Sequence, residues 1–225
     1  MTAGRQPLIV VVSDRRRLCQ AVGRPLGDAA DLLAAQVRAA AACGIAVFQL
    51  REPDLAGGAL LSLAVHLAAV AGPMLRVVVN DRADVAAAAG LGVHLREHSL
   101  PTARVRAWWP ATPWLSRAVH DATSLAAAGP VDLVIAGTVA ATASKPDARR
   151  LGLEGLRRLA AASAPPVVGI GGLSAADWPA LRAAGAAGFA AIGTFLPAAG
   201  ESIAGAMARA TRIDAAVVDS PGGVS

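Results

Sequence analysis

Short apolar runs recur along the whole chain, and each of them has the length and residue types of a β-strand. Between the runs lie segments whose apolar residues have helical spacing, so strand and helix alternate from one end to the other. The predicted strands span residues 8–12, 46–50, 76–80, 91–95, 114–119, 131–137, 166–172 and 188–193.

The predicted helices are rich in alanine and leucine. Asp28, Asp121 and Ser174 each place a side-chain oxygen at a predicted helix start, where it can accept a hydrogen bond from a free amide of the first turn. The helices span residues 28–43, 57–71, 82–89, 121–128, 153–163, 175–184 and 201–210.

A βα unit repeated eight times, without a hairpin signal, indicates parallel strands joined by right-handed crossovers. Such a set closes as a single (β/α)₈ TIM barrel, and eight strands in 225 residues favour closure over an open doubly wound sheet. We expect the barrel to span residues 1–212 and to be followed by a flexible C-terminal tail over 213–225.

Composition narrows the class of protein. The net charge of +5 is spread along the chain and only 3% of residues are aromatic, which argues against a nucleic-acid partner. Cys19 and Cys43 form no disulfide or zinc pattern. No apolar run approaches the roughly 20 residues that span a bilayer, so no membrane partner is expected. These features predict a cytoplasmic protein and leave its oligomeric state open.

In a TIM barrel, chemistry takes place in the loops that follow the strands. The loops after strands seven and eight are the usual phosphate site, and here they carry Gly171, Gly172, Gly193 and Thr194. Glycine lets backbone amides approach an anion, and a helix is predicted to begin at Ser174. These loops therefore predict phosphate binding, whereas the alternative is two tight turns that need glycine.

The loop after strand six carries Thr142, Ser144 and Lys145. Lys145 is the only lysine among 21 basic residues. A compact charge on a flexible stem can reach a phosphate from a loop, although a lysine before a proline is also common in solvated loops.

Polar residues also follow the second and third strands. Gln49 and Arg51 point to one side of strand two, where Arg51 could bind a phosphate with both arms of its guanidinium or instead pair with Glu52 or Asp81. Asn80 and Asp81 end strand three and could cap a helix, bind substrate or, through Asp81, hold a hard metal ion.

Histidines are the remaining candidates for chemistry. His120 follows strand five and is the natural general acid/base at the mouth, with helix capping as the alternative. His94 and His98 lie four residues apart, but on a strand and in the loop beyond it. They need not share a face, so a metal site formed by this pair is not expected.

Seven motifs in order resemble the superfamily of thiamine phosphate synthases and TenI-type thiazole tautomerases. The resemblance implies a (β/α)₈ barrel that binds a thiazole phosphate on the loops after strands six to eight, through Thr142, Ser144, Lys145, Gly171, Gly172, Gly193 and Thr194. The motifs are QLRE, VVVNDRADVA, GLGVHL, AVHD, TASK, PVVGIGGLS and AGAAGFAAIG.

The synthase branch joins hydroxymethylpyrimidine diphosphate to the thiazole phosphate, releases pyrophosphate and uses Mg²⁺. The resemblance implies that Asp81 would be its metal ligand and that the pyrimidine and diphosphate would be bound by Gln49, Arg51, Asn80 and Asp81. Two positions depart from the synthase pattern: Pro53 replaces a lysine and Ser99 replaces a metal-binding aspartate. Arg96 or Glu97 could compensate, by holding Mg²⁺ from a shifted position or the diphosphate directly.

The tautomerase branch moves a proton on the thiazole phosphate and needs no cofactor. Its R-S-V-H motif resembles residues 117–120, with Ala118 in place of serine, which implies that His120 carries the proton. Because of the two departures from the synthase pattern we expect a tautomerase, with the synthase as the close alternative. A catalytically silent thiazole phosphate regulator and another phosphate-binding barrel remain as further alternatives.

Overall fold

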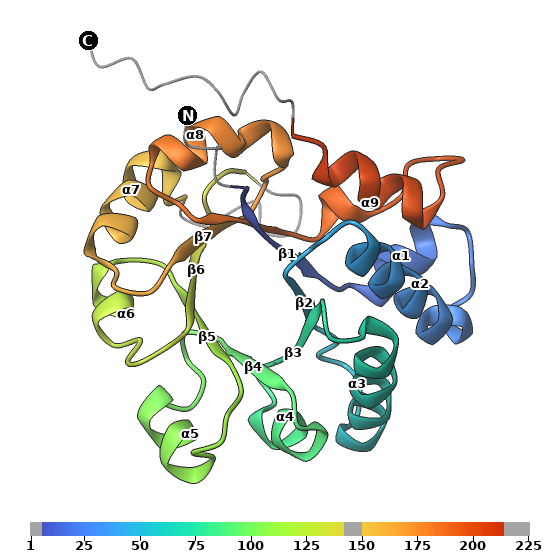
Figure 1. Ribbon diagram of the computed structural model, residues 1–225, viewed down its shortest axis with the longest axis horizontal. Helices are drawn as coiled ribbons and strands as arrows, with labels where there is room; N and C mark the ends of the chain where they lie inside the picture. Colours follow the sequence, from blue (N-terminus) through green and yellow to red (C-terminus); the bar gives the residue numbers. More distant parts are fainter. Residues whose placement is uncertain (1–5, 142–149, 214–225) are drawn as a thin grey trace.

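Eight parallel strands close into a barrel in the computed structural model, which describes residues 6–141 and 150–213 (Figure 1). Each strand pairs with the next along the chain, and β8 pairs with β1. The predicted TIM barrel is confirmed. The strands are β1 (Leu8–Val12), β2 (Val47–Leu50), β3 (Arg76–Asn80), β4 (Gly92–Leu95), β5 (Leu115–Val119), β6 (Leu133–Gly137), β7 (Val167–Ile170) and β8 (Gly188–Ala191).

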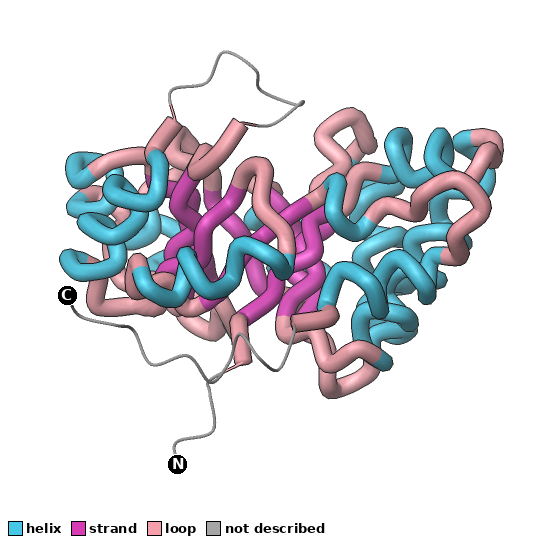
Figure 2. Tube along the Cα trace, turned by 90° about the horizontal axis from the view of Figure 1, so that it is seen from above, coloured by secondary structure: helices cyan, strands magenta, loops and turns pink. Residues whose placement is uncertain are grey.

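Helices surround the barrel as an outer layer, as Figures 1 and 2 show. They are α1 (Arg15–Ala21), α2 (Ala29–Ala42), α3 (Gly57–Ala71), α4 (Ala83–Ala89), α5 (Thr102–Trp108), α6 (Ala122–Ala126), α7 (Gly152–Ala162), α8 (Trp178–Ala183) and α9 (Ile203–Thr211). Three short 3₁₀ helices are η1 (Leu26–Asp28), η2 (Ala175–Asp177) and η3 (Gly193–Phe195).

Two helices were not predicted, α1 and α5. Both lack the alanine- and leucine-rich pattern by which the other helices were predicted: α1 begins with three arginines, and α5 contains two arginines among its 7 residues. The side chain of Asp14 caps α1 by accepting a hydrogen bond from the amide of Arg17 at 3.1 Å.

The predicted helix caps have mixed outcomes. Asp121 caps α6 as expected, accepting from the amide of Ser124 at 2.8 Å. At the start of η2, the Ser174 amide donates a hydrogen bond to the Asp177 carboxylate at 2.8 Å, and this bond fixes the first turn. The prediction for Asp28 was wrong, because its carboxylate accepts from Arg24 Nε at 2.6 Å instead of capping α2.

The core has two layers. One lies between the strands and the helices, and the other fills the barrel interior with residues such as Val10, Val47, Val78 and Val168. Strands buried on both faces read as continuous apolar runs, which is why the sequence shows them clearly. In the described ranges no helix is long and apolar enough to cross a membrane. Residues 214–225, most of the predicted tail, lie outside these ranges.

Candidate active site at the barrel mouth

The barrel interior becomes polar toward the C-terminal ends of the strands. Gln49 Nε2 donates a 3.0 Å hydrogen bond to Asn80 Oδ1, which joins β2 to β3. Gln49 is only 4% exposed, and its Oε1 atom has no hydrogen-bond partner among the described residues. A buried amide oxygen without a partner is costly, so this acceptor is suited to a donor group on a ligand.

A second polar pair extends this interior layer across β4 and β5. His94 Nδ1 lies 2.8 Å from Ser116 Oγ. Burial of His94 lowers its pKa to about 4, so the imidazole is neutral near pH 7. His98 is exposed in the loop beyond β4, whereas His94 is buried in the strand.

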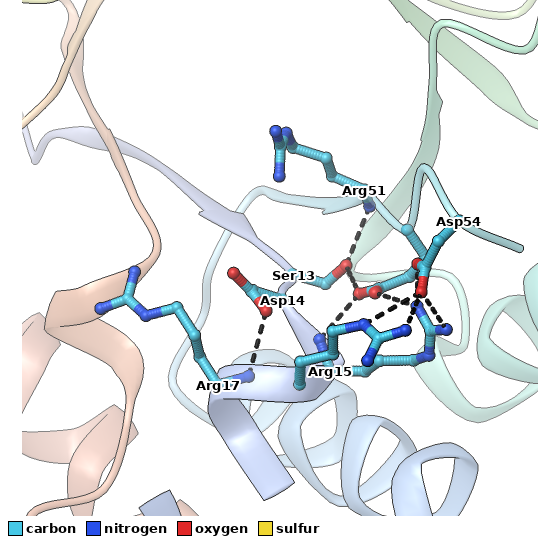
Figure 3. A network of polar contacts seen from close by, with 8 residues as sticks. Ser13, Asp14, Arg15, Arg17, Arg51 and Asp54 are labelled. Atoms are coloured by element: carbon cyan, nitrogen blue, oxygen red, sulfur yellow. Dashed lines mark hydrogen bonds and ion pairs between the residues drawn. The ribbon is translucent and has the colours of Figure 1, made fainter. Parts of the chain in front are cut away.

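The loops after β1 and β2 are joined by a buried ion-pair cluster (Figure 3). Glu52 accepts hydrogen bonds from Ser13 Oγ at 2.6 Å and from Arg15 Nη1 at 3.0 Å. Arg15 Nη2 also donates to Asp54 at 2.8 Å. Desolvation raises the pKa of Glu52, and the bonds from Ser13 and Arg15 oppose that shift. Glu52 therefore braces the two loops.

Because Arg15 and Ser13 occupy Glu52, this carboxylate is not free to pair with Arg51. Only the backbone amide of Arg51 joins the cluster, donating to Ser13 Oγ at 2.8 Å. The Arg51 side chain points away from the cluster, as Figure 3 shows. No described residue pairs with its guanidinium, so the predicted alternative of a salt bridge to Glu52 or Asp81 does not form.

A second cluster joins the loops after β3 and β4. Asp81 has a positive φ of 65°, and its amide donates to His94 O at 2.7 Å. One carboxylate oxygen of Asp81 accepts from the Ser99 hydroxyl, and the other is paired with the Arg96 guanidinium. Partial burial raises the pKa of Asp81, but the bonds from Ser99 and Arg96 outweigh it and hold the pKa below its usual value. Asp81 does not cap α4.

This second cluster does not fit Mg²⁺ as it is arranged. Mg²⁺ takes octahedral oxygen ligands, usually one or two carboxylates together with substrate phosphates and water. Both oxygens of Asp81 are already engaged, one of them by a cation. Across residues 6–141 and 150–213, no group of three or more His, Cys, Asp or Glu side chains is placed to hold a metal ion.

Arg117 shapes the same loop, a role that the sequence did not reveal. It is buried beside the loop after β4, where Nη1 donates to Leu100 O at 2.9 Å and Nη2 donates to Glu97 O at 2.8 Å. Burial lowers the pKa of Arg117, and the negative charge of Glu97 opposes that shift. Arg117 thus fixes the backbone that carries Arg96 and Ser99.

His120 lies at the C-terminal end of β5, as predicted. Its Nδ1 atom is 2.7 Å from Glu97 Oε2, and its side chain is 44% exposed. Its backbone amide donates to Ser124 Oγ at 2.9 Å. His120 therefore holds the β4 loop through Glu97 and is not the side-chain cap of α6.

The predicted phosphate loops have glycines for a packing reason as well. Gly171 and Gly172 have positive φ of 104° and 64°. A Cβ atom would come within 2.4 Å of Thr138 Cγ2 at Gly171 and within 2.2 Å of Ala141 O at Gly172. No described residue accepts a hydrogen bond from either amide. The tight turns that we weighed as the alternative are present, and phosphate binding remains a prediction.

The loop after β8 meets the loop after β7 through Thr194, whose hydroxyl donates to Leu173 O at 2.7 Å. A Cβ atom on Gly193 would lie 3.3 Å from Arg17 Nη2. No described residue pairs with the Arg17 guanidinium, which points away from the Glu52 cluster in Figure 3. Arg17 was missed because α1 was missed. Three predicted phosphate ligands, Thr142, Ser144 and Lys145, lie outside the described residues.

Together these features define a TIM-barrel protein with a polar interior layer and, at the C-terminal mouth, two guanidinium groups that pair with no described residue. The family model described as thiamine monophosphate synthase matches residues 19–195. The chain belongs to this family.

Individual relatives agree with the family assignment. A thiamine-phosphate synthase of Azorhizobium caulinodans is 40% identical over 161 residues, which are 69% of this chain and 76% of that protein. A thiamine-phosphate synthase of Methanoculleus marisnigri is 40% identical over 182 residues, which are 78% and 84% of the two chains. The solved structure of a Pyrococcus furiosus thiamine phosphate pyrophosphorylase has a TM-score of 0.76 and 25% identity, and the match covers 94% of this chain and 95% of that one.

The expectation of tautomerase-type proton transfer by His120 was wrong. Relatives that are 40% identical over most of the chain are named thiamine-phosphate synthases, which was our alternative. Our error was to treat Pro53 and Ser99 as evidence against the synthase, although the rest of the motif order is shared by both branches.

Proposed function

We propose that this protein is a thiamine phosphate synthase that joins hydroxymethylpyrimidine diphosphate to thiazole phosphate. The bond between the pyrimidine methylene carbon and the diphosphate oxygen breaks, and pyrophosphate leaves with the electron pair. The lone pair of the thiazole nitrogen then forms the new C–N bond to that carbon. The relatives that carry this name support the proposal.

The observation that carries it is the guanidinium of Arg51, which has no partner among the described residues and follows Gln49 of the Gln49–Asn80 pair by two positions. A diphosphate leaving group needs fixed positive charge where its negative charge develops, and Arg51 supplies it in a fork that matches phosphate oxygens. Because Arg15 neutralises Glu52, Arg51 is free for this role.

The pyrimidine ring would lie against Gln49 and Asn80. Its exocyclic amino group is a hydrogen-bond donor, and the buried Oε1 atom of Gln49 is an acceptor without a partner in the described residues. Asn80 accepts from Gln49 and thereby fixes the orientation of that amide.

The thiazole phosphate would be bound on the opposite side of the mouth, by the loops after β6, β7 and β8. We assign the backbone amides of Gly171 and Gly172 to it, together with Gly193 and Thr194. Thr142, Ser144 and Lys145 keep the same role on the grounds of sequence. Arg17, next to Gly193, adds a positive charge that the sequence did not predict.

His120 has a different task in this reaction. The coupling uses a nitrogen lone pair and needs no proton carrier, so we assign His120 a positioning role through its contact with Glu97. The two free cysteines, Cys19 and Cys43, are compatible with a reducing compartment, and a cytoplasmic location is part of this proposal.

The test is pyrophosphate release from hydroxymethylpyrimidine diphosphate and thiazole phosphate, measured with and without Mg²⁺. The wild-type protein should release pyrophosphate, and Arg51→Ala should lower kcat/KM by about 10²-fold or more, as expected for loss of a group that stabilises the leaving charge. Arg38→Ala, an exposed arginine on α2, is the matched control and should leave the rate unchanged. A wild-type protein that releases no pyrophosphate under either condition would refute the proposal.

A further inference from the structure

The cluster formed by Asp81, Arg96 and Ser99 suggests how this chain neutralises its anionic substrate. We propose that the Arg96 guanidinium takes the place of a divalent cation beside Asp81, so that the diphosphate is bound by arginines without Mg²⁺. This inference rests on the proposed synthase function and concerns the means by which the diphosphate is held.

The first argument is the occupancy of Asp81. One of its carboxylate oxygens accepts from the Ser99 hydroxyl, and the other is paired with Arg96 Nη2. To bind Asp81, a metal ion would have to displace a guanidinium of the same sign of charge. One positive charge is therefore already present beside Asp81 and is covalently attached to the chain.

The second argument is the chemistry of Ser99. Its hydroxyl donates to Asp81, and its oxygen accepts from the Arg96 amide at 2.9 Å. A carboxylate at this position would offer a second anionic oxygen to a metal, whereas a hydroxyl offers a neutral one. Ser99 instead ties the backbone of Arg96 to Asp81 and completes a closed ring of contacts.

The third argument is that Arg96 can reach a ligand. Its side chain is 68% exposed, compared with 8% for Arg15 in the Glu52 cluster. A guanidinium has five N–H donors, so the contact with Asp81 leaves others for phosphate oxygens. An exposed ion pair is also weak, so Arg96 can turn donors toward a diphosphate at little cost while it stays beside Asp81.

The fourth argument is position. Asp81 directly follows Asn80, and Asn80 is bonded to Gln49 on the neighbouring strand β2. Arg51 follows β2 and Arg96 follows β4, so the two guanidiniums come from the strands on either side of β3. Two arginines on either side of the Gln49–Asn80 pair can together neutralise a diphosphate.

The experiment is isothermal titration calorimetry with inorganic pyrophosphate, in EDTA and then in excess Mg²⁺. The wild-type protein should bind in EDTA, and Mg²⁺ should not tighten the binding. Arg96→Ala should raise the Kd in EDTA by about tenfold or more, as expected for loss of a charge-assisted contact. Arg82→Ala removes a nearby arginine that pairs with Asp84, and it should leave the Kd unchanged. Binding that requires Mg²⁺, or an unchanged Kd in Arg96→Ala, would overturn the inference.

Two further variants separate the roles of Asp81 and Ser99. Asp81→Asn tolerates the positive φ and removes the carboxylate that competes for Arg96, so binding in EDTA should be retained. Its loss would show that the diphosphate site needs the Asp81–Arg96 pair intact and that Arg96 alone does not hold the anion, which would overturn the inference. The double variant Arg96→Gly, Ser99→Asp should bind weakly in EDTA and recover in Mg²⁺. Failure of Mg²⁺ to rescue it would show that Arg96 and Ser99 are not what excludes the metal.

Failure of this inference can be told apart from failure of the synthase proposal. If pyrophosphate binds through Arg96 in EDTA but the two substrates give no turnover, the synthase proposal fails and the metal-free anion site stands. If turnover and pyrophosphate binding both require Mg²⁺, the synthase proposal stands and the role of Arg96 is refuted.

Discussion

Two arginine–carboxylate clusters lie at the same mouth and differ in their exposure to water. In the cluster after β1 and β2, the Arg15 and Glu52 side chains are 8% and 3% exposed. In the cluster after β3 and β4, the Arg96 and Asp81 side chains are 68% and 23% exposed. Buried pairs are costly to break, whereas exposed pairs contribute little to stability. The first cluster therefore fixes the loops, and the second is suited to exchange its partner for a ligand.

The buried cluster should give the largest effect on stability. Glu52→Ala removes the buried acceptor shared by Ser13 Oγ, the Arg15 amide and Arg15 Nη1, and leaves the guanidinium with Asp54 alone, so the free energy of unfolding should fall by about 3 to 5 kcal/mol. Urea denaturation would measure it. Glu154→Ala removes an exposed glutamate that pairs with Arg157 and Arg158, and it should cause no measurable change. Equal effects of the two variants would remove the distinction between buried and exposed clusters.

The buried His94 on β4 should make the stability of the fold depend on pH. Its pKa of about 4 in the fold lies below its ordinary value of 6.5. Between these values the unfolded chain binds more protons, so stability is fully present above pH 6.5 and is lost as the pH falls toward 4, by about 3 kcal/mol in total. In urea denaturation at several pH values, His94→Gln should flatten this dependence, and the exposed His98→Gln should not. The same slope in both variants would contradict the assignment.

Arg117 anchors the loop after β4, which carries the exposed cluster. Arg117→Met removes the donors to Leu100 O and Glu97 O, and should lower the free energy of unfolding by about 2 kcal/mol. Amide hydrogen exchange in residues 96–101 should become faster, because the loop that carries Arg96 loses its anchor. Arg104→Met, on the exposed face of α5, serves as the control. Unchanged exchange in the loop would mean that Arg117 does not hold it.

The exposed cluster should give the smallest effect on stability. Arg96→Ala should lower the free energy of unfolding by less than about 1 kcal/mol, since exposed ion pairs contribute little. The same urea measurement as for Glu52→Ala gives a direct comparison. A loss as large as that of Glu52→Ala would show that Arg96 is a structural brace and is not free to exchange its partner.

The strands and most helices could be predicted because their signals are local. A strand of a parallel barrel is buried on both faces, so each reads as an apolar run, and helices as long as α2 and α3 show their period. Helices α1 and α5 were missed because arginines interrupt the alanine- and leucine-rich pattern that marks the others. Arg17 was missed for that reason.

The sequence predicted that the candidate residues lie at the strand ends, but it did not predict which side chains pair with each other. The rule that barrel chemistry follows the strand ends selected Gln49, Arg51, Asn80 and Asp81. The sequence does not tell which carboxylate each arginine meets, since long flexible side chains have many rotamers and several acids lie within reach. The reaction itself was predicted wrongly, because two changed residues were weighed above a shared order of motifs.

The sequence alone determined the eightfold alternation, the closed barrel and the family. Strands that are buried on both faces appear as continuous apolar runs, and the family motifs are short, so neighbouring residues carry both signals. Only the tertiary structure decided that Arg15 takes Glu52, 37 positions away, and that Arg96 takes Asp81. Barrel closure brings distant loops together, and the depth at which each pair then lies sets its solvation. The buried Arg15–Glu52 pair therefore fixes two loops, whereas the exposed Arg96 remains able to bind a ligand.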